Sequence, residues 1–197
     1  MTDEQLASFR SLLEDFGTLA AIASEMKWAK TETKHFEFRI PNSLNAFFCI
    51  SAIGFEKGFV RDHFEEAAVQ VMIAAPTLYE EFDADKEWQD DEQRRDKLNN
   101  HWGVPVREYL EYKELELTED SIDNMTGYIC VNAIYDRSTC SYKDYALPQN
   151  ALEMLSFFND VKLYSIGEER CSGNGGRSWM ALKDDTFLWV KYSGLSD

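Results

Sequence analysis

Residues 178–192 read SWMALKDDTFLWVKY: two runs of aromatic and aliphatic side chains, separated by Asp184-Asp185. Each run has the length of a strand, and a two-residue connection made of turn-forming residues is typical of a β-hairpin. We therefore expect strands at 178–183 and 186–192 that pair antiparallel. This hairpin indicates that the C-terminal part of the chain forms an antiparallel sheet.

More strands and one short helix are expected upstream of this hairpin. Residues 108–118 and 127–135 are rich in Tyr, Leu, Ile and Val and predict two paired strands joined by an acidic turn. Pro148 begins a short helix, and 161–166 predicts the next strand. The glycine-rich residues 172–176 precede a strand and not a helix, so they predict a connection and not a phosphate loop. The order over 106–197 is therefore β-β-α-β-β-β, with a ferredoxin-like tendency.

The N-terminal half is expected to be mostly helical. Apolar residues at three- and four-residue spacing predict helices at 3–29 and 59–75, the second ended by Pro76, and a polar surface helix at 85–102. A short strand is expected at 35–40, while the apolar run 44–53 fits a buried helix turn or a strand. These patterns predict the α+β class, with a helical N-terminal half packed on a mostly antiparallel C-terminal sheet. Two subdomains, 1–105 and 106–197, are expected, and they can also form one continuous domain.

The composition narrows the possible partners. The 197 residues carry a net charge of −16, yet 44% of them are hydrophobic, so the chain can build a real core. Strong negative charge argues against direct binding to nucleic acid or to an anionic membrane, because like charges repel. The start of the chain resembles no signal peptide, and none of its four cysteines lies in a CxxC pair. We therefore expect a cytoplasmic protein with reduced thiols.

The charge is concentrated in one stretch, residues 80–123, which we call the acidic segment. It holds sixteen acidic and six basic side chains, a net of −10 in 44 residues. One interpretation is a solvated surface that keeps the protein soluble. The other is a binding surface, because aromatic side chains are interleaved with the charges as they are in protein interfaces. The expected partner-binding residues are Glu80, Glu81, Asp83, Asp85, Glu87, Trp88, Asp90, Asp91, Glu92, Glu108, Glu111, Glu114 and Glu116.

Residues 99–176 resemble the YubB-type ferredoxin-like domain family of phage and plasmid proteins. The matching features, in family order, are NNHWG at 99–103, the strand expected at 127–135, ALP at 146–148, ALEMLS at 151–156, DVKLY at 160–164 and Glu168-Glu169. The tryptophan that the family has after its second strand is absent, and Tyr142 and Tyr145 are the nearest aromatics. The resemblance implies a mobile-element origin and an α+β sheet, and it transfers no catalytic residues.

The sequence offers few residues for catalysis or metal binding. His35, His63 and His101 are isolated from one another, and no zinc or calcium pattern is present. We expect His63 to lie on the apolar stripe of the 59–75 helix. Cys171, beside Arg170, is the most plausible reactive thiol, although structural use is the simpler interpretation. We therefore expect no catalytic residue, no metal site and no cofactor.

Three functions remain open from the sequence. The first is a non-enzymatic acidic inhibitor from a phage or other mobile element, which binds a basic, nucleic-acid-handling defence protein in the manner of an anti-CRISPR or anti-restriction DNA mimic. The second is an immunity protein that neutralises a nuclease toxin, for which the same charge argument holds. The third is a small enzyme. The sequence does not fix the oligomeric state.

Overall fold

The computed structural model describes residues 1–25, 30–39, 47–74, 117–133, 135–136, 141–142, 147–171 and 174–195. Within these ranges the helices are α1 (Asp3–Glu14), α2 (Phe16–Glu25), α3 (Phe59–Asp62), α4 (Phe64–Ala74), α7 (Ile122–Ala133) and α8 (Gln149–Ser156). The strands are β1 (Lys30–Arg39), β2 (Phe47–Phe55), β3 (Leu117–Asp120), β4 (Tyr135–Asp136), β5 (Ser141–Tyr142), β6 (Leu163–Cys171), β7 (Asn174–Lys183) and β8 (Thr186–Leu195). None of the described helices is long and apolar enough to cross a bilayer.

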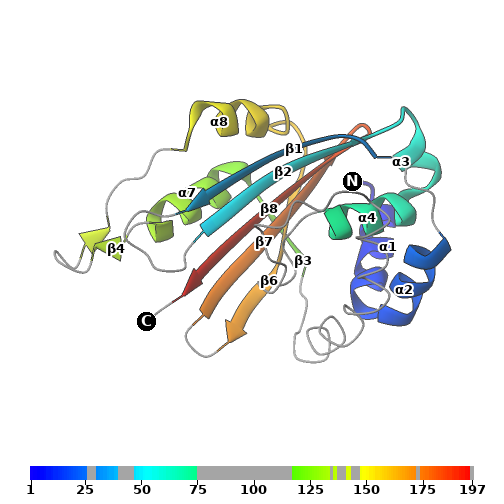
Figure 1. Ribbon diagram of the computed structural model, residues 1–197, viewed down its shortest axis with the longest axis horizontal. Helices are drawn as coiled ribbons and strands as arrows, with labels where there is room; N and C mark the ends of the chain where they lie inside the picture. Colours follow the sequence, from blue (N-terminus) through cyan, green and yellow to red (C-terminus); the bar gives the residue numbers. More distant parts are fainter. Residues whose placement is uncertain are drawn as a thin grey trace. The chain divides into compact units, whose positions relative to one another are not determined.

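The main sheet has the strand order β1-β2-β8-β7-β6-β3, which confirms an α+β fold with an antiparallel sheet (Figure 1). The expected hairpin is present: β7 and β8 flank Asp184-Asp185, and Asp184 has a φ of 52°. Such a left-handed residue lets two residues reverse the chain. Strands β6 and β7 also pair antiparallel, with Cys171 opposite Asn174, and residues 174–176 of the glycine-rich stretch belong to β7.

The strand predicted at 127–135 is wrong, because residues 122–133 form helix α7. Ser121 accepts a hydrogen bond at its Oγ from the backbone N–H of Asn124 (3.1 Å), the usual arrangement at a helix start. Met125 and Ile129 are four residues apart on one face and are fully buried. Burial along this face outweighs the strand propensity of the Tyr-Ile-Cys-Val run. The order β-β-α-β-β-β is therefore corrected to β3-α7-β4-β5-α8-β6-β7-β8 in the described part of residues 117–195.

The N-terminal half is less helical than expected, because it contributes β1 and β2 to the sheet. The ambiguous run at 44–53 becomes strand β2 from Phe47 onward. The single helix expected at 3–29 is two helices, because the Asp15 carboxylate caps α2: it accepts from the backbone N–H and the hydroxyl of Thr18 (3.1 and 2.6 Å). These hydrogen bonds from Thr18 lower the pKa of Asp15.

The described residues divide into two compact units by their contacts. Unit 1 contains residues 1–25, 30–32, 53–74 and 184–186. Unit 2 contains 33–39, 47–52, 117–133, 135–136, 141–142, 147–171, 174–183 and 187–195. The expected boundary at 105/106 lies outside the described residues and stays a prediction.

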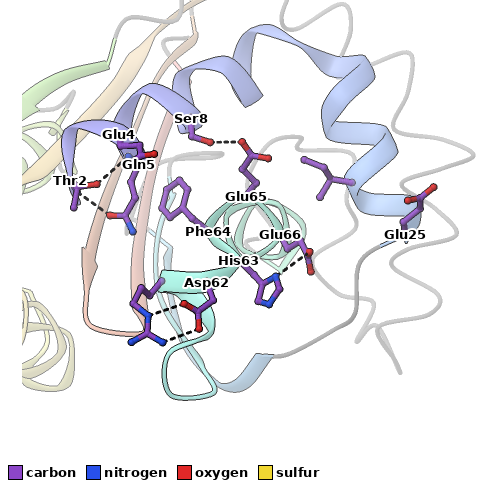
Figure 2. A pocket seen from close by; sticks show the side chains of 12 residues that line it. Thr2, Glu4, Gln5, Ser8, Glu25, Asp62, His63, Phe64, Glu65 and Glu66 are labelled. Carbon is purple, nitrogen blue, oxygen red and sulfur yellow. Dashed lines mark hydrogen bonds and ion pairs between the residues drawn. The ribbon is translucent and has the colours of Figure 1, made fainter.

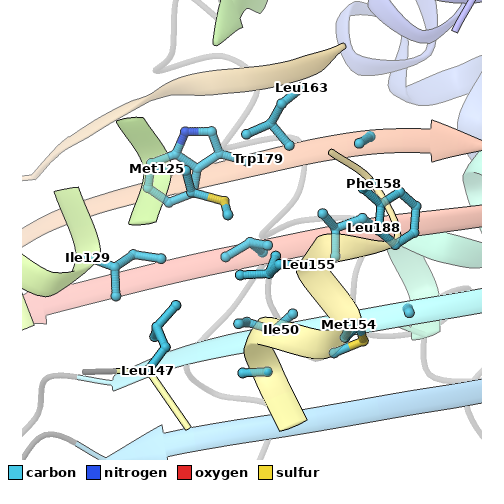
Figure 3. Close-up of a cluster of buried hydrophobic side chains, with 14 of the residues drawn as sticks. Ile50, Met125, Ile129, Leu147, Met154, Leu155, Phe158, Leu163, Trp179 and Leu188 are labelled. Carbon is cyan, nitrogen blue, oxygen red and sulfur yellow. The ribbon is translucent and has the colours of Figure 1, made fainter. Parts of the chain in front are cut away.

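Helices α7 and α8 cover one face of the sheet in unit 2 (Figure 1). Their buried faces meet apolar side chains of β2, β6, β7 and β8 in a single core, with Trp179 and Phe158 among its largest members (Figure 3). Trp179 lies edge-on to Tyr128, with ring centroids 5.6 Å apart. Its indole N–H donates to Asp120 Oδ2 (2.8 Å). Side-chain alternation places Trp189 of β8 on the opposite face, and it is buried as well.

Unit 1 is built on helix α4, whose residues 67–72 are all buried. Helices α1 and α2 both contact α4, and α1 buries Phe9, Leu12 and Leu13. The β7–β8 turn, residues 184–186, also belongs to this unit. The Asp185 carboxylate accepts hydrogen bonds from the backbone N–H groups of Gly58 (2.8 Å) and Val60 (3.1 Å) at the start of α3. A turn far from α3 in the sequence thus supplies the cap that α3 lacks in its own residues.

We expect Asp160→Asn to weaken unit 2 at neutral pH and to have little effect in acid. The hydrogen bond from Lys183 lowers the pKa of Asp160. A lowered folded-state pKa stabilises the fold above the unfolded pKa of about 3.9, and the contribution is lost as the pH falls through the folded value. Urea unfolding at pH 7 and at successively lower pH measures this difference. Lys183→Met removes the same pair together with the hydrogen bond to the Phe157 carbonyl (2.9 Å), so its effect should shrink in acid but not vanish. A D160N effect that persists in acid would contradict the linkage.

Candidate functional site

The thirteen partner-binding residues expected between Glu80 and Glu116 lie outside the described residues. The described end of the acidic segment comprises β3 and the start of α7. There Glu119 pairs with Lys162 (2.8 Å), and Asp120 accepts the indole N–H of Trp179. Asp123 is exposed in the first turn of α7, where a carboxylate is favoured by the helix dipole. Two of the three described acids in this stretch therefore have structural partners.

The isolated candidates for chemistry fall in different places. His101 lies outside the described residues, and His35 belongs to β1. Cys171 ends β6, where it pairs with Asn174 of β7. His63 lines a pocket in unit 1.

A pocket of about 750 Å³ opens in unit 1 beside helices α1, α2, α3 and α4 (Figure 2). Five carboxylates line it together with one guanidinium and one imidazole. The lining residues are Thr2, Glu4, Gln5, Ser8, Ile22, Glu25, Arg61, Asp62, His63, Phe64, Glu65 and Glu66. We call this the acidic pocket.

Two local features of the chain shape the acidic pocket. Helix α1 begins with a capping box, in which Thr2 Oγ1 accepts from the Gln5 N–H (3.2 Å) and Gln5 Oε1 accepts from the Thr2 N–H (2.9 Å). The second feature is a break at His63, where the backbone leaves helical geometry between α3 and α4. The expectation of one continuous helix over 59–75, with His63 on its apolar stripe, is therefore wrong. The His63 side chain is 52% exposed.

The carboxylates of the pocket are only partly compensated by positive charge. Arg61 donates from Nε and Nη2 to the two carboxylate oxygens of Asp62 (2.8 and 2.9 Å). These hydrogen bonds lower the pKa of Asp62 and raise that of Arg61. The one guanidinium that lines the pocket is thus already paired. Glu4, Glu25, Glu65 and Glu66 leave a net negative charge, even if His63 carries a proton.

Two of the carboxylates are held in place by neighbouring side chains. Ser8 donates its hydroxyl to Glu65 Oε1 at 2.6 Å, which joins α1 to α4. Glu66 Oε1 lies 3.5 Å from His63 Nδ1. The His63 ring stacks on Phe59 with centroids 5.1 Å apart, and Phe59 stacks on Phe55 at 5.7 Å. The imidazole is therefore the exposed end of an aromatic stack, with its plane fixed by its neighbours.

The Ser8 hydroxyl and the imidazole that line the pocket contact different carboxylates. Ser8 donates to Glu65 and His63 faces Glu66, so the two side chains do not form a serine–histidine pair in this pocket (Figure 2). Within the described ranges, no three His, Cys, Asp or Glu side chains converge as a bound metal ion requires. Carboxylates that surround a recess without converging can neutralise an extended organic cation.

Comparisons of the chain with protein-family models, with curated proteins and with solved structures found no match. The resemblance of residues 99–176 to the YubB-type family therefore stays a prediction.

The sequence analysis missed the acidic pocket because its acids are scattered along the chain. Glu4, Glu25 and the 62–66 stretch are brought together only by the packing of α1 and α2 on α4. Each is unremarkable on a helix surface. The one available signal was the dense run Asp62-His63-Phe64-Glu65-Glu66, where charged residues interrupt an otherwise apolar helix.

Proposed function

We propose that this protein is a non-enzymatic acidic inhibitor that binds a basic, nucleic-acid-handling defence protein. It is of the anti-CRISPR or anti-restriction type, is encoded by a phage or other mobile element, and acts in the cytoplasm of the host cell. The observation that carries this proposal is the acidic pocket, a recess with five carboxylates and a single guanidinium that is already paired. Its chemistry selects a cationic group and repels a phosphate.

Electrostatics decide which class of partner fits. A groove that handles nucleic acid presents lysine and arginine side chains, which normally neutralise phosphates. Fixed carboxylates can compete for those side chains, and complementary charge makes the encounter fast and sensitive to salt. A net charge of −16 raises the local concentration of a basic partner around the whole protein.

The acidic segment supplies a second set of contacts in this proposal. Its thirteen expected residues combine carboxylates with Trp88, and an aromatic anchor among charges is a common composition of protein interfaces. The pocket and the segment make separate contributions to binding, so separate groups of substitutions can test them.

Charge reversal in the acidic segment should weaken inhibition, whereas the same reversal elsewhere should not. The assay follows target cleavage by a panel of CRISPR effectors and restriction enzymes, at low and high salt. The variant Asp90→Lys/Asp91→Lys/Glu92→Lys is compared with Glu14→Lys/Glu56→Lys/Glu153→Lys, three exposed acids outside both the segment and the pocket. We expect the first triple variant to lose about 10-fold or more in potency, since buried or clustered interface charges carry large energies.

A pocket variant completes this test. Glu4→Gln/Glu25→Gln/Glu65→Gln/Glu66→Gln keeps the side-chain shapes and removes four charges, so its potency should also fall. Equal potency of wild type, the segment variant and the pocket variant would exclude the electrostatic mechanism. Turnover of a substrate at substoichiometric protein would instead favour an enzyme.

A further inference from the structure

We infer that the acidic pocket receives an arginine side chain of the protein partner, held between carboxylates and stacked on the imidazole of His63. This inference rests on the proposed function and specifies which basic group the partner presents. Three properties of the pocket carry it: its size and lining, its unpaired charge, and the flat aromatic face at its rim.

The size and lining of the pocket favour a long side chain over a small ion. The recess of about 750 Å³ is far larger than a single cation needs, and its acids come from four helices. Half-buried Ile22 and Phe64 also line it, so apolar surface stands beside the charges (Figure 2). Lysine and arginine carry their charge on an apolar stem that packs along such surface. The charged group of such a side chain would lie among the glutamates, and its apolar stem would pack against Ile22 and Phe64.

The unpaired charge gives the pocket its preference for a cation. Ser8 orients Glu65, and Glu66 lies beside His63, but neither carboxylate forms an ion pair with a lysine or arginine among the described residues. The Glu66 side chain is 36% exposed, so it retains access to an incoming group. The carboxylates are therefore held in place before a partner arrives, which lowers the entropy lost on binding.

The His63 ring distinguishes arginine from lysine. It ends the Phe55–Phe59–His63 stack and is half-exposed, so a planar group can lie on it. A guanidinium is planar and stacks on aromatic faces, whereas an ammonium is a strongly hydrated point charge. The rim of the pocket already holds one guanidinium in a two-point contact with a carboxylate, that of Arg61 on Asp62. The same two-point geometry is available to an incoming arginine at Glu65 or Glu66.

The test uses two peptides with blocked termini, acetyl-Gly-Gly-Arg-Gly-Gly-amide and the same peptide with lysine in place of arginine. Each is titrated into the 15N-labelled protein at low ionic strength, and binding is followed by NMR. We expect amide shifts at residues of the acidic pocket, with the arginine peptide binding about two- to fivefold more tightly, the size of an exposed stacking contact. Equal affinities for the two peptides, or shifts that map elsewhere, would overturn the inference.

Variants separate the contribution of charge from that of the aromatic face. Glu65→Gln/Glu66→Gln should weaken both peptides about two- to fivefold per carboxylate, while Glu14→Gln/Glu56→Gln, which removes the same charge from the same unit outside the pocket, should not. His63→Ala should abolish the preference for arginine but leave lysine binding nearly unchanged. His63→Phe retains a flat ring and should restore the preference. Loss of the preference in His63→Phe as well would show that stacking is not its cause.

Failure of this inference can be distinguished from failure of the proposed function. If the segment and pocket variants lose inhibition while both peptides bind with equal affinity, the proposed inhibitory function is supported and the inferred preference for arginine is wrong. If the arginine peptide binds selectively in the pocket but no nucleic-acid-handling enzyme is inhibited, arginine recognition by the pocket is supported. The proposed class of partner is then wrong.

Discussion

Trp179→Ala is expected to lower the free energy of unfolding by about 3–5 kcal/mol, the usual cost of removing a large aromatic side chain from a core. Trp179 is fully buried in the unit 2 core, between the sheet and α7 (Figure 3). Truncation would leave a cavity where its ring meets Tyr128 and would remove the hydrogen bond to Asp120. Urea unfolding followed by far-ultraviolet circular dichroism measures the loss. A cost below about 1 kcal/mol would mean that this residue is not in a close-packed core.

A pair of milder variants separates the hydrogen bond from the packing. Trp179→Phe and Trp189→Phe remove a similar volume from two buried indoles. The Nε1 of Trp179 donates to Asp120, whereas the Nε1 of Trp189 is buried without a hydrogen-bond partner in the described structure. Removing an unsatisfied donor relieves a desolvation cost and offsets part of the lost packing. Trp179→Phe should therefore be the more destabilising of the two, by about 1 kcal/mol.

Asp185→Ala is expected to destabilise unit 1 by about 2–3 kcal/mol, because two part-buried backbone donors would lose a charged acceptor. The Asp185 carboxylate connects the β7–β8 turn to Gly58 and Val60 at the start of α3. Without it α3 loses its only observed side-chain cap among the described residues. Asp185→Asn keeps one acceptor oxygen and should fall between wild type and Asp185→Ala in a urea titration.

The neighbouring residue supplies the matched control. Asp184 is exposed, carries the same charge, and adopts the left-handed φ of 52° that asparagine tolerates well. Asp184→Asn should therefore leave the unfolding midpoint nearly unchanged. If Asp184→Asn and Asp185→Asn lowered the unfolding midpoint equally, stability would depend on negative charge near the turn and not on the cap on α3.

The sequence predicted best those elements that local patterns determine. The strands around Asp184-Asp185 and the helix after Pro148 were placed correctly, because turn chemistry and apolar periodicity agree there. The break at Asp15 was missed because the apolar spacing continues across it, and only the side-chain cap on α2 ends the first helix. Helix α7 was missed because its buried face is defined by the sheet on which it packs, and that is not visible in a run of β-branched and aromatic residues.

The candidate site was harder to predict than the fold, for a related reason. Counting charges along the sequence identifies acidic residues that lie close together in the chain, such as those of the acidic segment. It does not identify acidic residues that come close only in the folded structure. Glu4 and Glu66 line the same pocket because α1 packs on α4, although the two residues are far apart in the sequence. A basic partner, inferred from the net charge, stays a prediction, whereas the pocket can be located only in the tertiary structure.

The position of β8 in the sheet also bears on how this protein is made. This strand, the last described element of the chain, lies between β2 and β7, so β1 and β2 gain their neighbour in the sheet only after residues 186–195 have left the ribosome. Pairings between such distant parts of a chain form slowly, and the early strands must wait with an unpaired edge. A message cut short before codon 186 would yield a product with the sheet divided into β1–β2 and β7–β6–β3. The six-stranded sheet can therefore be completed only after β8 has been made.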